Sequence, residues 1–294
     1  MDSDDRSDAK VSGRLTIGQC ATLACLLELA APKPGNVHRG ADFEDLTFTD
    51  FAVSAVALAP AMDAAAAGMP VGQCVLCAIE ATRRSVPTNT NLGIVLLLAP
   101  LAAADPSLSF SDGLAQVLMR LSPEDARDVY QAIRLAQPGG LGQVEQMDVA
   151  GESPDDLLIA MRAAAGRDLV AQQYTNGFAQ VLGHVVPSLE FGERAGWSTT
   201  ESIVYAHVRL LSDFADSLIA RKCGSATARQ ASERAAAVLR AGEPGGAMYL
   251  DALASFDFWL RSDHQRRNPG TTADLVTAGI FAALRDGILQ PRFR

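Results

Sequence analysis

The chain has 294 residues, of which 48% are hydrophobic and 20% are charged, so it can bury a large core and does not have the composition of a disordered protein. Its formal net charge of −9 argues against non-specific binding to nucleic acid, but it leaves room for an anionic small substrate in a local basic pocket. Five cysteines without dense spacing argue against a disulfide framework.

Neither the start of the chain nor its longest apolar run has the pattern of a targeting or membrane segment. Residues 1–10 are acidic and polar, whereas a signal peptide needs a basic start and an apolar stretch. The longest apolar run, Leu92–Ala104, is too short for a bilayer span, which needs about 20 residues. We therefore expect a cytoplasmic protein that binds neither a membrane nor nucleic acid and begins with a disordered acidic segment over residues 1–12.

The first half of the chain predicts helices, because its apolar residues recur at helical spacing between turn residues. Thr47 and Asp50 form a capping box at the start of the second helix, and Pro60 is expected to kink it. The predicted helices of this half cover Leu15–Ala31, Thr47 to Gly68, Val71–Val86, Leu92–Ala104, Ser111 to Leu121 and Ser122 to Pro138.

The second half continues in the same way. A helical pattern starts at Ser153 and runs to about Val185, with bends expected near Gly166 and Gly177. The last four helices are expected over Glu201–Lys222, Thr227–Ala241, Met248–Ser262 and Thr272–Asp286. Thr271 and Asp274 are interpreted as a capping pair for the last of these. With no alternating strand, the sequence predicts an all-α fold: a single globular domain of about ten or more helices over residues 13–294.

The Leu92–Ala104 helix is apolar on every face, which is typical of a helix in the middle of a protein. Either the rest of its own chain or a second subunit could cover it. A homodimer is therefore one of two arrangements that the pattern allows.

A polar loop over Pro32–Asp45 breaks the helical pattern with prolines, glycines and many charged residues. Lys33 stands where it could contact phosphate as a point charge, and His38 would add a donor. Asp42 and Asp45 offer the hard oxygen ligands that Mg²⁺ prefers, usually shared with substrate phosphates. Cations beside carboxylates suit a metal-bound polyphosphate. The alternative is a solvated loop that caps the next helix.

A second polar loop, Thr88–Gly93, opens the buried apolar helix. Backbone N–H groups at a helix N-terminus bind anions, and the neutral side chains of Asn89 and Asn91 could orient hydroxyls, bases or phosphate oxygens. N-capping is the alternative, and it accounts for one of these residues better than for all four polar ones.

Three further segments carry polar residues. Arg266–Leu275 enters the last helix through a Pro-Gly turn, which fits phosphate binding and capping equally well. Arg167 and Asp168 are polar within helical surroundings, which indicates either a cleft or the surface stripe of a bent helix. Arg221 and Lys222 are interpreted as the basic end of a helix, which the helix dipole favours.

Taken in order, these segments resemble the triphosphoribosyl-dephospho-coenzyme A synthase family. The matching pieces are Glu28 with Pro32–Gly35, Thr88–Gly93 and Pro269–Leu275, and their spacing carries the resemblance over nearly the whole chain. The resemblance implies an all-helical enzyme in which the 2′-hydroxyl of 3′-dephospho-coenzyme A attacks the ribose C1 of ATP. Adenine then leaves, and the triphosphate stays on the transferred ribose.

For that reaction we expect carboxylates near the anomeric carbon and groups that neutralise the triphosphate. Asp42 and Asp45 would hold Mg²⁺ or act at the hydroxyl, and Glu28 is a further candidate for the general base. The expected substrate-binding residues are Lys33, Gly35, Asn36, His38, Thr88, Asn89, Asn91, Gly93, Arg167, Asp168, Gly270, Thr271 and Asp274.

This chain departs from the family's usual pattern over Ala41–Leu46 and Pro138–Asp148, which leaves the acceptor open. The expected partners are ATP and either dephospho-CoA or a related ribosyl or pterin acceptor. One alternative is an ATP-dependent step in one-carbon cofactor biosynthesis of the tetrahydromethanopterin type. Another is a helical nucleotide-binding protein without catalytic activity. Release of adenine from ATP separates the transferase from both.

Overall fold

The computed structural model describes residues 15–44, 46–138 and 149–290, and the predicted disordered segment over residues 1–12 lies outside them. The described residues form helices and no β-strand, so the all-α prediction is confirmed. In chain order the helices are α1 (Ile17–Ala30), α2 (Phe48–Ala57), α3 (Ala59–Ala66), α4 (Val71–Ser85), α5 (Leu92–Ala103), α6 (Phe110–Met119), α7 (Pro123–Ala136), α8 (Leu157–Ala164), α9 (Leu169–Asn176), the π-helical turn η1 (Val181–Val185), α10 (Val186–Ala195), α11 (Thr199–Asp213), α12 (Ser217–Cys223), α13 (Ser225–Arg240), α14 (Ala247–Arg261) and α15 (Gly270–Arg285).

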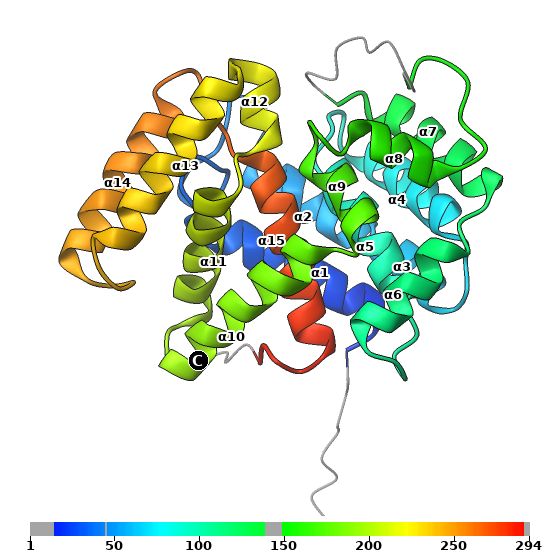
Figure 1. The fold of residues 1–294 in the computed structure, drawn as a ribbon, viewed down its shortest axis with the longest axis horizontal. Helices are drawn as coiled ribbons and strands as arrows, with labels where there is room; N and C mark the ends of the chain where they lie inside the picture. The colour runs from blue at the N-terminus through cyan, green and yellow to red at the C-terminus, as the bar shows by residue number, and fades with distance from the viewer. Residues whose placement is uncertain (1–14, 45, 139–148, 291–294) are drawn as a thin grey trace, which may run out of the picture.

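The last helix, α15, runs through the middle of the molecule (Figure 1). It packs against α1, α5, α10 and α11, and most of its residues from Thr271 to Ala283 are buried. In Figure 1, α11, α13 and α14 lie to one side of it, and α3 to α8 lie to the other. One hydrophobic cluster extends from Cys20 in α1 to Leu289 after α15, so both sides share a core that α15 connects.

The α5 helix is buried as the sequence predicts, and its own chain covers it. Of its twelve residues, ten are buried, from Leu92 to Ala102. It lies against α3, α4, α6, α9 and α15. A second subunit is therefore not needed to shield this helix.

Several predicted boundaries are confirmed by their caps. The side chain of Thr47 accepts a hydrogen bond from the Asp50 amide, and the Asp50 carboxylate accepts one from the Thr47 amide. The helix that follows is interrupted at Leu58, two residues before Pro60, because a proline inside a helix removes a donor and clashes with the preceding turn. Ser122 likewise forms a capping box with Asp125.

Other boundaries differ from the prediction. The cap of α6 is Ser109 rather than Ser111, and α8 begins after Asp156, whose carboxylate caps it, rather than at Ser153. The pattern expected to bend near Gly166 and Gly177 is divided at these glycines into α8, α9 and η1. A further helix, α10, follows where no helix was predicted.

By length and composition, the stretch Phe48–Ala66 that α2 and α3 form together could cross a membrane, with a mean hydropathy of 1.2 over its most apolar window. Core helices of soluble proteins meet the same criterion. Here the stretch is interrupted at Leu58 and packs against α1 and α4.

The largest difference is at Asp216, where the predicted helix Glu201–Lys222 is broken into α11 and α12. The fully buried carboxylate of Asp216 caps α12: its Oδ1 accepts hydrogen bonds from the amides of Leu218 and Ile219 at 2.8 and 2.9 Å. Its Oδ2 accepts from the amide and the hydroxyl of Thr272 at 2.7 and 2.8 Å, in the first turn of α15. One side chain therefore caps two helices, and the expected capping by Thr271 and Asp274 does not occur.

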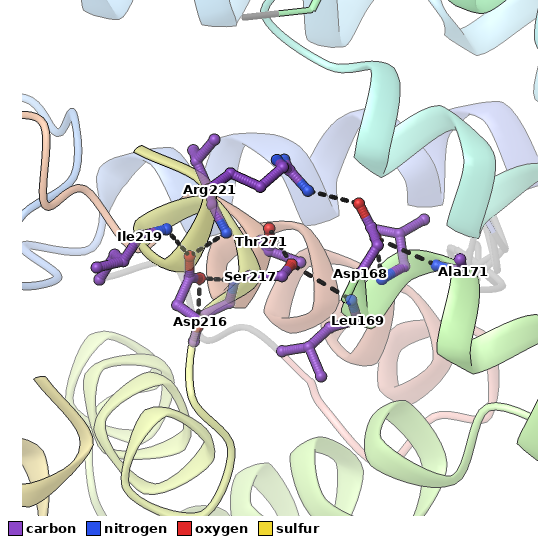
Figure 2. A network of polar contacts seen from close by, with 11 residues as sticks. Asp168, Leu169, Ala171, Asp216, Ser217, Ile219, Arg221 and Thr271 are labelled. Atoms are coloured by element: carbon purple, nitrogen blue, oxygen red, sulfur yellow. Dashed lines mark hydrogen bonds and ion pairs between the residues drawn. The ribbon is translucent and has the colours of Figure 1, made fainter. Parts of the chain in front are cut away.

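The neighbouring Ser217 extends this connection to a third helix. Its hydroxyl donates to Thr271 Oγ1 at 3.0 Å and accepts from the amide of Leu169 at 3.3 Å (Figure 2). The N-terminal ends of α9, α12 and α15 are thereby held side by side.

We expect Asp216→Ala to lower the free energy of unfolding by about 3 kcal/mol or more, because it removes two helix caps and leaves buried donors without an acceptor. Chemical denaturation followed by circular dichroism measures this change. Asp213→Ala, at an exposed carboxylate three residues earlier, is the matched control and should change stability by less than about 1 kcal/mol. Equal effects of the two substitutions would contradict the double-cap role.

Candidate active site

A cavity of about 530 Å³ lies where the N-terminal ends of α5, α9 and α15 meet. It is lined from α1, from the loops before these three helices, from α12, and from α7 and α8. Eleven of the predicted site residues line it: Glu28, Asn36, Thr88, Asn89, Asn91, Gly93, Arg167, Asp168, Gly270, Thr271 and Asp274. These residues come from α1 and from four of the five polar segments that the sequence analysis singled out, and the fifth, Arg221 and Lys222, lines the cavity as well.

Four predicted residues do not line the cavity, and Asp45 lies outside the described residues. Asp42 is exposed, and its carboxylate accepts a hydrogen bond from the Phe48 amide at 2.6 Å, at the start of α2. His38 accepts a hydrogen bond from the Gly40 amide within its own loop. The capping alternative describes Asp42 better than the expected metal site. Among the described residues there is no group of three His, Cys, Asp or Glu side chains that could hold a metal ion.

Gly35 does not approach the cavity either, and its conformation serves the packing of the first loop on α14. Its φ of +74° is in the left-handed region, and a Cβ there would lie 2.8 Å from Leu260 Cβ. Its amide donates to Asp257 Oδ1 at 2.7 Å, and Arg261, which pairs with Asp257, donates to the backbone oxygen of Asn36. This network fixes Asn36 at the cavity wall.

Lys33 was expected to contact phosphate, but its side chain is completely buried beneath the cavity. Its Nζ lies 3.1 Å from Glu28 Oε1 and donates to the backbone oxygens of Glu28 and Ala31. All three ammonium donors thus have acceptors, which favours the charged form of Lys33. Burial raises the pKa of Glu28, and the charge and the hydrogen bond of Lys33 oppose this shift without cancelling it. Burial likewise lowers the pKa of Lys33, against the charge of Glu28.

Asp274 faces the cavity from the first turn of α15 and has a different environment. Its carboxyl group makes no hydrogen bond or ion pair with another described residue. Burial, and then the negative charges of Glu28, Asp216 and Asp168, raise its pKa well above the usual value, and Arg221 offsets only part of this. The structure therefore places a carboxyl group that tends to remain protonated near one that is ion-paired with a lysine.

Gly93 makes room for Asp274. A Cβ on Gly93, in the first turn of α5, would lie 2.0 Å from Asp274 Oδ2. The glycine of the second polar loop thus permits close approach of a protein carboxyl group, rather than only of a substrate as expected.

The two asparagines of the second loop have separate roles. Asn89 Oδ1 accepts a hydrogen bond from the Leu92 amide at 3.1 Å, which is the capping alternative of the sequence analysis. Asn91 donates to Thr82 Oγ1, and its own Oδ1 is buried without a partner among the described residues. An unpaired buried acceptor at a cavity wall favours a ligand that donates a hydrogen bond.

Two cations in the cavity wall were not predicted as site residues. Arg221 donates to Asp168 Oδ2 at 2.6 Å, while Asp168 also caps α9 (Figure 2). Lys222 donates to Asn268 Oδ1 at 3.0 Å. With Arg167 they place three positive charges at the cavity. Arg221 and Lys222 do lie in the last turn of a helix, as the sequence indicates, but only the tertiary packing of α12 places them at the cavity.

The remaining wall is apolar. The residues that α7 and α8 contribute are Val129, Tyr130, Ile133, Leu157, Ala160, Met161 and Ala164. Every charged residue in the lining comes instead from α1, α12, α15 or the loop before α9. The cavity therefore has a charged side and an apolar side.

Residues 14–293 match the model of the ATP:dephospho-CoA triphosphoribosyl transferase family, CitG. The chain belongs to this family. A crystal structure of an Archaeoglobus fulgidus protein assigned as a triphosphoribosyl-dephospho-coA synthase is similar, with a TM-score of 0.60 and 26% sequence identity. The alignment covers 80% of this chain and 98% of that one. No curated protein matches.

In this transferase family member, Gly93→Ala should displace Asp274, because the new methyl group would overlap its carboxylate. We expect a fall in kcat of about 10²-fold, as a shift of about 1 Å in a catalytic group can cost that much. Steady-state kinetics measures the change. Gly183→Ala is the control, since its Cβ would meet no atom within 4 Å.

A double-mutant cycle separates this effect from a direct clash with substrate. In an Asp274→Ala background, Gly93→Ala should have little further effect, because the overlapping carboxylate is gone. An equal loss of activity in both backgrounds would show that the methyl group acts on substrate and not on Asp274.

Proposed function

We propose that this chain transfers the 5-triphosphoribosyl group of ATP to the 2′-hydroxyl of 3′-dephospho-CoA within the cavity, with Glu28 as general base and Asp274 as general acid. The observation that carries these roles is the pair of carboxyl groups in one cavity whose environments differ in charge. Glu28 is paired with Lys33, whereas no cation among the described residues forms an ion pair with Asp274. Paired groups with divided pKa values are typical of acid–base catalysis.

The reaction needs one proton acceptor and one proton donor. A bond forms between the 2′-oxygen of the acceptor and the ribose C1 of ATP, and the bond from C1 to adenine N9 breaks. The hydroxyl proton passes to the base, and a proton from the acid passes to a ring nitrogen of the leaving adenine. The positive charge that develops on the ribose is stabilised by a nearby carboxylate, as in glycoside hydrolysis.

Glu28 suits the base because it is paired with a cation and faces the cavity. Its carboxylate is held by Lys33 from below, so it keeps a fixed position while it accepts a proton. Asp274 suits the acid because its raised pKa keeps the proton that adenine needs. Asn91, with its unpaired Oδ1, can accept a hydrogen bond from the exocyclic amino group of adenine beside Asp274.

The charged side of the cavity suits the triphosphate. Arg167, Arg221 and Lys222 supply positive charge, and the N-terminal ends of α5 and α15 add their dipoles. We propose that Mg²⁺ enters with ATP and is held mainly by phosphate oxygens and water, since the described residues offer no three-ligand protein site. Its contribution would be to neutralise charge on the triphosphate, whose position the three cations fix.

The first experiment is chromatographic detection of adenine after incubation with ATP and Mg²⁺, with and without 3′-dephospho-CoA. The proposal expects adenine only with the acceptor, together with a triphosphoribosylated product of matching mass. ATP binding without adenine release would instead favour the non-catalytic nucleotide-binding protein. Adenine release with a pterin or another ribosyl acceptor, but not with dephospho-CoA, would favour the alternative cofactor pathway.

Glu28→Gln and Asp274→Asn should each lower kcat by about 10²- to 10⁴-fold while ATP binding is retained, because an amide cannot exchange the proton. An ATP analogue with an N7-methylated base, which leaves without being protonated, tells the two roles apart. Asp274→Asn should recover most of its activity with this analogue, whereas Glu28→Gln should not. Recovery of both variants, or of neither, would contradict the assigned roles.

Lys33→Met should shift the acid side of the pH profile of kcat/KM to higher pH. The substitution removes the cation that lowers the pKa of Glu28, so Glu28 becomes protonated at a higher pH and the base is lost earlier as pH falls. The alkaline side, where Asp274 loses its proton, should change less. An acid side that does not move would show that Glu28 is not the base.

Stability is the control for this variant, because removing Lys33 leaves a buried carboxylate without its partner and should cost about 3–5 kcal/mol. The double variant Lys33→Met/Glu28→Gln should regain part of that stability and remain inactive. The profile is therefore measured only where circular dichroism shows a folded protein.

A further inference from the structure

The apolar side of the cavity has no task in the reaction described above. Seven residues from α7 and α8 line it, and none of them is charged. Val129, Tyr130 and Leu157 are almost completely buried in the fold, so this wall is built on packed side chains rather than on a mobile surface. Ala160 and Ala164 lie one turn apart on α8 and are half-buried, which leaves open space in front of them.

Four of the six charged residues in the described lining, Glu28, Arg221, Lys222 and Asp274, come from other helices than this wall. Arg167 and Asp168 instead follow α8 directly and hydrogen-bond to its last turn, so they lie at the border of the two sides. Arg221 and Lys222 belong to α12, and Asp274 belongs to α15, both of which lie on the other side of α9 from α7 and α8 in Figure 1. The Arg221–Asp168 ion pair ties α12 to the start of α9. A ligand that uses the whole cavity therefore has its charged and polar groups at one end and is largely uncharged at the other.

The two substrates differ in this respect. ATP carries its charge on the triphosphate. In the proposed function, the polar groups of its base form hydrogen bonds with Asn91 and Asp274 on the charged side of the cavity. Dephospho-CoA combines an adenosine diphosphate part with a long pantetheine arm that has a branched dimethyl carbon, methylene groups, amides and a thiol, and no charge. Burial of such groups against an apolar wall is favourable by about 0.8 kcal/mol per methylene.

We propose that the groove between α7 and α8, formed by Val129, Ile133, Leu157, Ala160, Met161 and Ala164, binds the pantetheine arm of the acceptor. This inference rests on the proposed function, and it adds the part of the protein that selects the acceptor. The adenosine diphosphate part of the acceptor then lies on the charged side, with its 2′-hydroxyl near Glu28. The phosphates and the pantetheine arm of the acceptor then contact different helices.

Ala164→Phe tests the assignment by filling the groove with a ring from the half-buried face of α8. ADP serves as the matched acceptor, because it is dephospho-CoA without the pantetheine arm. The proposal expects the preference of kcat/KM for dephospho-CoA over ADP to fall by tenfold or more in Ala164→Phe, with the KM for ATP unchanged. Ala163→Phe is the control, since Ala163 is exposed on the same helix and does not line the cavity, and it should keep the preference.

Calorimetric titration of the same three proteins with dephospho-CoA and with ADP supplies a readout that needs no turnover. The dissociation constant of ADP divided by that of dephospho-CoA should fall by tenfold or more in Ala164→Phe alone. A raised KM for ATP with an unchanged acceptor preference would overturn the inference and place the ATP base in the groove. Unchanged ratios in both assays would overturn it as well.

These outcomes are distinct from failure of the proposed function. If the wild-type protein releases no adenine with any acceptor, the reaction assignment fails, and the binding ratios still decide whether the groove holds the arm. If adenine is released and the ratios do not change, the reaction stands and the groove assignment fails.

Discussion

The site depends on one buried carboxylate, that of Asp216, which caps α12 and α15 at the same time. Capping a single helix is a local interaction, but capping two fixes their N-terminal ends relative to each other. Since α12 carries Arg221 and Lys222 and α15 carries Asp274, this residue sets the distance between the cations proposed to bind phosphate and the proposed acid. Four hydrogen bonds compensate for the cost of burying its charge.

Three carboxyl groups of the described residues line the cavity, and each has a different environment. Glu28 is ion-paired with Lys33, Asp168 is bound by Arg221 and caps α9, and Asp274 has neither a cation contact nor a hydrogen bond to another described residue. Because a partner decides whether the charged form is favoured, the same chemical group can serve as base, as structural anchor and as acid within one cavity. The overall charge of −9 therefore says little about the site, where three cations gather.

Most of the fold could be predicted because helix periodicity and capping signals act locally. The Thr47–Asp50 and Ser122–Asp125 boxes set their helices within a few residues, and the apolar Leu92–Ala103 segment could only be a buried helix. The break at Asp216 has a local signal, the cap on the amides of Leu218 and Ile219, which the sequence analysis missed. Its second part, the hydrogen bond to Thr272, 56 residues away in the chain, is a tertiary contact that local patterns do not contain. The same tertiary contact replaced the local cap expected from Thr271 and Asp274.

The candidate site shows the same limit in its side chains. The sequence indicated which segments converge, because polar loops between apolar helices are where functional residues usually lie. Eleven of the expected residues line the cavity. The sequence did not indicate which side chains reach the cavity: Lys33 is buried against Glu28 and does not line it, and Asp42 caps a helix. Residue type and spacing therefore predict where chemistry is located, whereas the partner of each charged group, which only packing supplies, decides which chemistry it performs.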